Sequence, residues 1–195
     1  MKTKFFTTLL LLTSIMSFAQ NQKTEHLTFK GVPIDGTLME YVSKMKQNGF
    51  THLATNDGTA ILNGDFAGYK DCAIGVSTLE QKDLVHKIVV IFPEKDTWST
   101  LCGNYIDLKE MLTEKYGEPS EVVEKFDSYS QPRDDENRMY NVKFDNCKYN
   151  STWETDKGNI QLSINHKGVV NCFITLVYFD KSNSELMRAK AIDDL

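Results

Sequence analysis

Apolar residues along the chain change twice from a helical spacing to a strand spacing. The first helical stretch follows a short strand and turn in residues 26–36. It opens with Thr37 and Glu40 in a capping box, where each side chain bonds the other residue's backbone amide. Four apolar side chains then recur at steps of three and four residues and share one face: Leu38, Tyr41, Val42 and Met45. Gly49 supplies the left-handed conformation that ends this helix.

From residue 50 to residue 93 the apolar spacing changes to two, as in strands. The sequence NDG at residues 56–58 predicts a tight turn between two of them. The stretch ends in IVVIFPEK, residues 88–95, whose apolar run is typical of a central strand covered on both faces. We therefore predict a meander of three or four antiparallel strands.

A second helix is predicted after this meander. Its apolar residues form one stripe at helical steps: Trp98, Leu101, Tyr105, Leu108 and Leu112. Gly117 and Pro119 end the helix. The segment SEVVEKF, residues 120–126, predicts a short strand, and the polar residues 127–139 predict an exposed loop.

A second meander is predicted for residues 140–180. Hairpin turns are expected at residues 156–158 and 167–168, with one buried and one wet face on the strand between them. The apolar residues change parity near Asp145, which a β-bulge would explain. A capping box at residues 182–185 predicts a final helix.

The last strand of the second meander, ITLVYFDK at residues 174–181, repeats the cadence and the acidic-lysine ending of IVVIFPEK. We therefore predict an α+β fold of tandem helix-plus-antiparallel-meander units, with a C-terminal helix. The units would be residues 20–95 and 96–195, within one compact domain. The alternative is a pair of unrelated α+β segments.

Residues 1–19 have the composition of a cleaved export signal. Lys2 and Lys4 precede an apolar stretch too short to span a bilayer, and small residues follow at the cleavage position near Ala19 and Gln20. A membrane anchor is the alternative. No cysteine follows the apolar stretch, so we expect no lipid anchor there. We expect an exported protein, periplasmic or extracellular, with no transmembrane segment in the mature chain.

The charge of the chain argues against two classes of partner. The full chain has 22 basic and 27 acidic residues, and removal of residues 1–19 would leave 20 basic residues and a net charge of 20 − 27 = −7. Such a surface suits neither nucleic acid nor anionic lipid. The expected partner is an unknown protein or envelope component.

Four cysteines lie beyond the export signal: Cys72, Cys102, Cys147 and Cys172. An exported chain can form disulfides, and these four allow three pairings, with buried free thiols as the alternative. A bridge between Cys147 and Cys172 needs an odd number of residues in the hairpin loop near Gly168. An even loop would turn Cys172 to the other face of the sheet.

Three segments carry a resemblance to other proteins. FKGVPIDGTLMEYVSKMKQNGF, LNGDFAGY and WSTLCGNYIDLKEMLTEKYGEPSEVVEKF are similar to exported proteins of unknown function from Bacteroides-type bacteria. The tandem plan also resembles, in topology only, the β-lactamase-inhibitor-like fold and the related small outer-membrane-assembly lipoproteins. That resemblance implies a binding protein that uses a sheet face or its loops, although the chain lacks the lipobox of the lipoproteins.

No catalytic, metal or cofactor motif stands out. The chain has no GxSxG nucleophile sequence, and its histidines, at positions 26, 52, 86 and 166, show no short-range spacing of metal ligands. The acidic run Asp134-Asp135-Glu136 lacks the alternation and glycine of a calcium loop and reads as solvated. We predict no catalytic residue, no metal site and no cofactor.

Aromatic residues are the best candidates for a binding surface. Five lie in the second half of the chain: Tyr129, Tyr140, Tyr149, Trp153 and Tyr178. Exposed aromatic side chains are strong anchors for protein partners, whereas burial under the helices is the alternative. We expect a non-enzymatic exported interaction protein that uses a sheet face and the loop 127–139. The alternatives are an inhibitor of a secreted hydrolase, or a hydrolytic enzyme built from scattered histidines and carboxylates.

Overall fold

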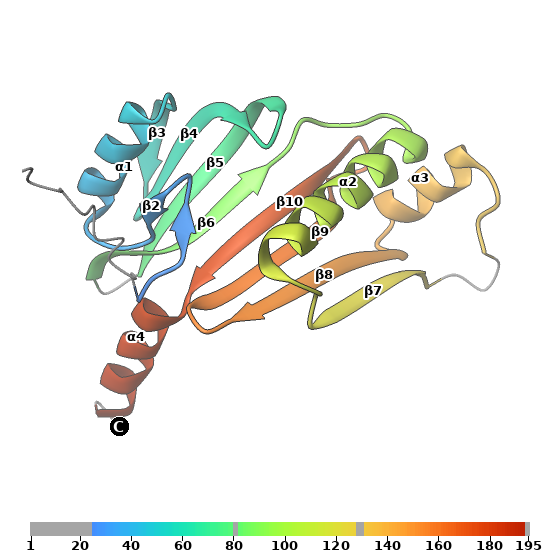
Figure 1. Cartoon of the computed structure of the whole chain (residues 1–195). Helices are drawn as coiled ribbons and strands as arrows, with labels where there is room; N and C mark the ends of the chain where they lie inside the picture. Colours follow the sequence, from blue (N-terminus) through green and yellow to red (C-terminus); the bar gives the residue numbers. More distant parts are fainter. Residues whose placement is uncertain (1–24, 80–81, 128–130, 194–195) are drawn as a thin grey trace, which may run out of the picture.

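The computed structural model describes residues 25–79, 82–127 and 131–193. Its main feature is one antiparallel sheet in the strand order β3-β4-β5-β6-β10-β9-β8-β7 (Figure 1). The strands are β3 (Thr51–Asn56), β4 (Thr59–Phe66), β5 (Tyr69–Leu79), β6 (Lys82–Ile91), β7 (Glu121–Phe126), β8 (Cys147–Thr155), β9 (Gly158–Lys167) and β10 (Asn171–Asp180). A small hairpin, β1 (Thr28–Phe29) and β2 (Val32–Pro33), lies apart from it. The helices are α1 (Leu38–Gln47), α2 (Trp98–Tyr116), α3 (Asp135–Lys143) and α4 (Lys181–Asp193).

The predicted tandem helix-plus-meander fold is wrong. The two meanders are not separate units, because β6 and β10 pair and make one continuous eight-stranded sheet. Strand (46%) outweighs helix (30%), so the fold is mostly β. The two strands that the sequence analysis compared are therefore neighbours, with Val177 opposite Val89 and Thr175 opposite Ile91. Their shared apolar character reflects a common place at the sheet centre, not a duplicated unit.

Local signals place α1 and α2 correctly. In α1 the amide of Glu40 donates to Thr37 Oγ1 at 3.3 Å, and the amide of Thr37 donates to Glu40 Oε2 at 3.2 Å, which confirms the capping box. The buried residues of α2 are the five of the predicted stripe: Trp98, Leu101, Tyr105, Leu108 and Leu112. Both helices therefore bury the face that the apolar spacing indicates.

The segment around residue 140 is a helix, so two predictions there are wrong. The last five residues of the predicted loop 127–139 and the start of the predicted second meander form α3. Asp134 caps it by accepting from the amide of Asn137 at 2.8 Å. Met139 and Val142, three residues apart, are its buried apolar side chains. The predicted bulge near Asp145 is instead the end of this helix, where Asp145 takes a φ of 59°.

The start of α4 also differs from its prediction. The cap is Asp180, whose Oδ1 accepts from the amide of Asn183 at 3.0 Å, and not the predicted box at residues 182–185. Asp180 is fully buried, so this cap fixes the helix to the sheet and does not merely end it. Beyond its first turns α4 projects away from the sheet (Figure 1).

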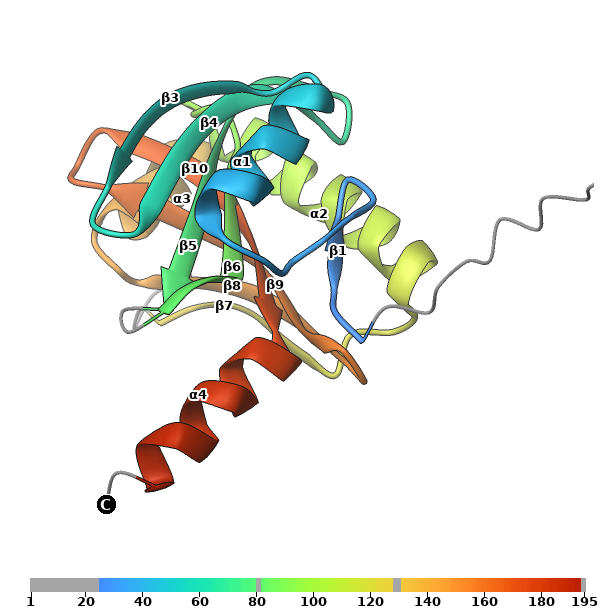
Figure 2. The same cartoon turned by 90° about the vertical axis from the view of Figure 1, so that its left-hand side faces the viewer.

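Three helices cover one face of the sheet. Helix α1 packs on β3 to β6, whereas α2 and α3 pack on β8 to β10. Strands β3 and β4 curve over α1 (Figure 2). The sheet residues that face these helices are the core, for example Leu62, Ile74, Ile160 and Leu176. Among the described residues, no helix is both long enough and apolar enough to cross a membrane.

Candidate functional site

The predicted aromatic surface does not form in the structure. Trp153 and Tyr178 are buried in the core, and the Trp153 indole donates to the carbonyl of Gly117 at 2.9 Å. Tyr149 is half-buried among other aromatic rings. Tyr140 is exposed, but it lies on α3 and stacks on Phe144 with ring centroids 4.3 Å apart. These four residues fall on the covered face or on a helix because α2 and α3 pack over this half of the sheet. Tyr129 lies outside the described residues.

Of the two possibilities for the cysteines, the structure has free thiols and no disulfide at Cys72, Cys102, Cys147 and Cys172. The hairpin loop between Lys167 and Asn171 has three residues, so Cys172 does face the covered side. Cys172 lies on β10 and Cys147 on β8, with β9 between them. Two strand spacings are about 9.5 Å, beyond the roughly 7 Å that a disulfide permits between Cα atoms. This spacing excludes the bridge that the odd loop would otherwise allow.

The thiols are also poor nucleophiles. Burial raises the pKa of Cys147 to about 12 and that of Cys72 to about 11. Neighbouring thiols at Cys102 and Cys172 raise the pKa of Cys147 further. Nucleophilic cysteines need the opposite shift, because the thiolate is the reactive form. These residues therefore pack the core.

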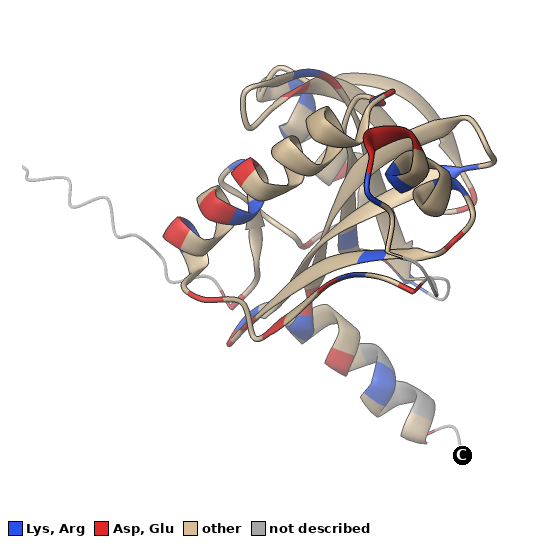
Figure 3. Ribbon diagram, turned by 90° about the vertical axis from the view of Figure 1, so that its right-hand side faces the viewer, with Lys and Arg blue, Asp and Glu red and all other residues tan. Residues whose placement is uncertain are grey.

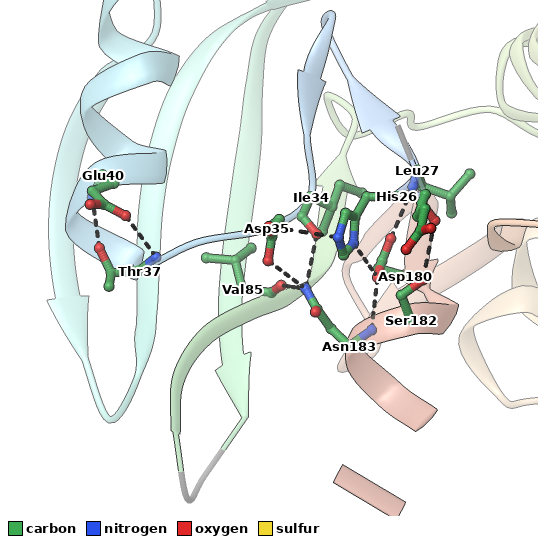
Figure 4. A network of polar contacts seen from close by, with 11 residues as sticks. His26, Leu27, Ile34, Asp35, Thr37, Glu40, Val85, Asp180, Ser182 and Asn183 are labelled. Atoms are coloured by element: carbon green, nitrogen blue, oxygen red, sulfur yellow. Dashed lines mark hydrogen bonds and ion pairs between the residues drawn. The ribbon is translucent and has the colours of Figure 1, made fainter. Parts of the chain in front are cut away.

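A buried polar cluster joins both ends of the described chain (Figure 4). Asp180 is fully buried, and its carboxylate accepts from His26 Nδ1 at 3.0 Å, from the amide of Leu27 at 2.9 Å and from the amide of Asn183 at 3.0 Å. The side-chain amide of Asn183 donates to the carbonyl oxygens of Ile34 at 3.1 Å and of Val85 at 2.8 Å. The cluster therefore ties the N-terminal hairpin and β6 to the start of α4.

The contacts of this cluster hold chain segments together and do not position a catalytic nucleophile. His26 lies between two carboxylates, with Asp35 Oδ2 at 3.6 Å from its Nε2. The two nearby hydroxyls both donate to backbone carbonyls, Ser182 to Glu25 at 3.1 Å and Ser184 to Asp180 at 2.6 Å. Neither hydroxyl is therefore held as a nucleophile against the imidazole.

The acidic run at residues 134–136 caps two helices. Asp134 caps α3, and the carboxylate of Asp135 accepts from the amides of Trp98 at 2.8 Å and Ser99 at 2.7 Å, at the start of α2. The hydrogen bonds from the amide and side chain of Asn137 lower the pKa of Asp134. The hydrogen bond from the Ser99 hydroxyl, and then those from the two amides, lower the pKa of Asp135. Within the residues that the structure describes, no group of three or more His, Cys, Asp or Glu side chains is arranged to hold a metal ion.

Two of the other histidines sit in opposite electrostatic environments, which yields a first test. The pKa of His166 is raised by its hydrogen bonds to Asp145 Oδ1 at 2.9 Å and to the carbonyl of Gly168 at 2.7 Å. The pKa of His86 is lowered by burial and then by Lys87. We expect an NMR titration to place the pKa of His166 above 6.5 and that of His86 below it.

The Asp145→Asn variant should lower the pKa of His166 and leave that of His86 unchanged. The His166 contact adds stability at pH values below the unfolded-state pKa of histidine, and this contribution disappears as the pH rises through the raised pKa. Equal pKa values for the two histidines would contradict the geometry around residue 166.

The sheet face opposite the three helices is apolar only in its centre. There Val89 and Ile91 of β6 lie beside Val177 and Thr175 of β10, and the neighbouring positions of β9 are polar. At one end of this face the first turns of α4 enclose a cavity of about 440 Å³ with Phe179 and with charged side chains. Most of these central residues are half-buried. This surface offers little that selects a partner.

A groove lies between α1 and the edge strand β3. It has a volume of about 770 Å³, within the ~300–1,000 Å³ usual for ligand sites. One wall is the flank of α1, with Met39 and Val42 as its apolar side chains. The other wall is β3, through His52 and Thr55, which bond each other at 2.8 Å. Met39 is 79% exposed, so this groove leaves apolar surface uncovered.

The two edges of the sheet differ in a way that points to the groove. Edge strands expose unpaired backbone groups, and proteins usually protect them with charged residues. The edge strand β7 carries Glu121, Glu124 and Lys125, and its ribbon bears both acidic and basic colours (Figure 3). Lys109 Nζ lies 2.6 Å from Glu124 Oε1. The edge strand β3 has the sequence THLATN, without Lys, Arg, Asp or Glu, and all six of its residues are exposed.

The outer edge of β3 is open for pairing. Within the described residues, β3 pairs only with β4. Asp57 and Gly58, with φ of 44° and 70°, form a two-residue turn that places Asn56 opposite Thr59. The residues flanking such a turn exchange backbone hydrogen bonds, so the next residue, Thr55, turns its amide and carbonyl away from β4. These backbone groups point to the side where a further strand would lie.

Sequence reasoning missed this groove. Val42 was assigned to the core face of α1, but it is half-buried and lines the groove. The signal that could have found it is the lack of Lys, Arg, Asp and Glu in residues 51–56. This lack is informative only once β3 is known to be an edge strand. No protein-family model, curated protein or solved structure matches the chain.

Proposed function

We propose that the chain is a non-enzymatic interaction protein that binds an extended segment of a partner protein alongside β3. The observation that carries this proposal is a fully exposed edge strand without Lys, Arg, Asp or Glu, beside a groove that combines the apolar side chains of Met39 and Val42 with polar and charged ones. Strand addition of this kind draws affinity from backbone hydrogen bonds and selectivity from side-chain pockets. The added segment would be the ninth strand of the sheet.

The dimensions of the site support this mode. β3 has six residues, with a bulge between His52 and Ala54, and spans at most about 20 Å at the usual strand rise. A strand beside it would place alternate side chains toward α1, against Met39 and Val42. The remaining side chains would face away from the helices. The groove therefore has room for alternate side chains of one extended segment.

This proposal relocates the binding surface that the sequence suggested. The open sheet face and residues 127–139 supplied the expected surface, but residues 135–139 belong to α3 and most of the candidate aromatic side chains are covered. Export to the periplasm or the exterior remains a prediction, because residues 1–19 lie outside the described chain. The partner would be a protein of that compartment.

Selection from a displayed library of short random peptides tests the proposed function. We expect peptides that bind the chain and that lose at least about tenfold in affinity with the Thr55→Pro variant. The proline removes an outward amide, and its ring occupies the space where the peptide backbone would pair. Proline is tolerated on an edge strand where the amide faces solvent, so the variant should fold.

The matched control is Thr55→Val, which also removes the hydroxyl that contacts His52 but keeps the amide. It should bind the selected peptides within about twofold of the original affinity. Urea unfolding of both variants checks that they fold. Peptides that bind Thr55→Pro as tightly as the unmodified chain, or no enrichment over an unrelated protein, would contradict strand addition at β3.

A further inference from the structure

We infer that the bound segment runs antiparallel to β3 and carries an acidic side chain at its C-terminal end, facing Lys46. This inference rests on the proposed function, because it assigns a direction and a charge to the segment that β3 would pair with. It follows from the unequal charge at the two ends of the groove and from the way α1 leads into β3.

The end of the groove next to the last turn of α1 is basic. Lys46 lines it there and supplies the positive charge, beside Gln47 and His52. β3 follows α1 through the short turn at residues 48–50, so its first residues lie beside that last turn. Lys46 is exposed and makes no ion pair within the described part of the chain. Its ammonium group is therefore available to an incoming carboxylate.

The other end of the groove is acidic. Asp83, at the start of β6, lines the groove and accepts from the amide of Leu38 at 2.9 Å, where α1 begins. Met39 and Val42 lie between the two ends. A segment in the groove thus meets a carboxylate first, then apolar side chains, and last an ammonium group, when followed from the start of α1 to its end.

Backbone pairing then selects the direction. Antiparallel strands pair slightly more favourably than parallel ones. A segment antiparallel to β3 runs in the same direction as α1, because β3 folds back along that helix. Its N-terminal end lies near Asp83 and its C-terminal end near Lys46. An acidic residue at the C-terminal end therefore meets the cation, and a basic residue there is repelled.

The carboxylate is assigned to a glutamate or aspartate side chain within a longer segment. β3 continues through Phe50 and Gly49 past the basic end, so the neighbouring chain has no structural reason to stop there. A free C-terminal carboxylate offers the same charge from a different source. The experiment below separates these two sources.

The probes are synthetic peptides with an alternating valine–threonine sequence and blocked ends, labelled for fluorescence anisotropy. One has glutamate near its C-terminal end, one has glutamate near its N-terminal end, and one has lysine near its C-terminal end. A fourth lacks acidic side chains but has a free C-terminal carboxylate. We expect the first peptide to bind about two- to fivefold more tightly than the others, the effect of one exposed ion pair.

The Lys46→Glu variant should reverse the preference between C-terminal glutamate and C-terminal lysine. The control is Lys44→Glu, because Lys44 is also in the last turn of α1 but does not line the groove. It makes the same change in net charge and should leave the preference intact. Preference for N-terminal glutamate, or an effect of Lys44→Glu equal to that of Lys46→Glu, would overturn the inference.

Three further outcomes show which part of the inference is wrong if it fails. Tighter binding of the free-carboxylate peptide would overturn the assignment to a side chain. Binding that Thr55→Pro weakens but that ignores charge at position 46 would overturn this inference and leave strand addition standing. Binding unaffected by Thr55→Pro, or dimers of the chain that Thr55→Pro dissociates in sedimentation velocity, would overturn the proposal of a foreign segment altogether.

Discussion

The Asp180→Ala variant should lose about 3–5 kcal/mol of unfolding free energy in urea denaturation. Asp180 is fully buried, and three donors converge on its carboxylate: His26 Nδ1 and the amides of Leu27 and Asn183. Alanine leaves both amides without their acceptor and removes the cap of α4. It also removes one of the two carboxylates beside the imidazole of His26. Each of these changes opposes folding.

Two comparison variants separate the causes of this loss. Asp180→Asn keeps one oxygen acceptor but removes the charge. Its free energy of unfolding should therefore lie between those of the unmodified chain and the alanine variant. Asp145→Asn removes a charge that also contacts a histidine, but this side chain is 90% exposed, and asparagine suits the left-handed φ of 59° at residue 145. Its cost should stay within about 0.5 kcal/mol.

Amide hydrogen exchange gives an independent measure of the hydrogen bonds to Asp180. We expect faster exchange at Leu27 and Asn183 in Asp180→Ala, because these amides lose their acceptor. A loss below about 1 kcal/mol, with exchange unchanged, would mean that the N-terminal hairpin and α4 are held by packing and not by this carboxylate.

Local signals predicted the elements whose cause is local. The capping box at Thr37 and Glu40 begins α1, and the apolar stripe of α2 is buried as its spacing requires. The short helix α3 was not predicted, because its residues were interpreted as a polar loop followed by an alternating strand. Its local signs were the cap at Asp134 and the three-residue step from Met139 to Val142. A helix of nine residues leaves few such signs.

The pairing of β6 with β10 could not be predicted from local pattern. It joins Lys87 to Phe179 and Ile91 to Thr175, residues far apart in the sequence, and nothing local selects the partner of a strand. The apolar run on both faces of IVVIF indicated a central strand, and this part was correct. The prediction of separate units failed because β6 and β10 are each the last strand of a meander, with one edge left unpaired, and these two edges pair to complete one sheet.

The candidate site depends on that same long-range pairing. An uncharged strand such as THLATN is unremarkable inside a sheet and informative at its edge. Strand order alone makes β3 an edge, and β3 and the flank of α1 then line the groove. Conversely, Trp153 and Tyr178 looked like anchors only while the covered face of the sheet was unknown.

The Gly158→Ala variant should lose more than about 4 kcal/mol of unfolding free energy. Gly158 begins β9 opposite Asp180, with a φ of 148° that side chains rarely adopt. A Cβ atom there would lie 2.0 Å from the carbonyl oxygen of Phe179 and 2.8 Å from Leu27 Cδ1. Relief requires β10 to move away from β9 where it enters the polar cluster, so the clash also disturbs Asp180.

The Gly168→Ala variant, at the other end of β9, is the matched control. Its φ is 62°, and nothing lies within 4 Å of an added Cβ atom. Alanine there should lower the free energy of unfolding by about 1–2 kcal/mol, because only the left-handed backbone conformation opposes it. The difference between the two variants therefore measures the close approach at residue 158 together with the greater backbone strain at its φ of 148°. Equal losses at the two ends of β9 would show that the strands near Asp180 can separate at little cost, and that the polar cluster does not require their contact at Gly158.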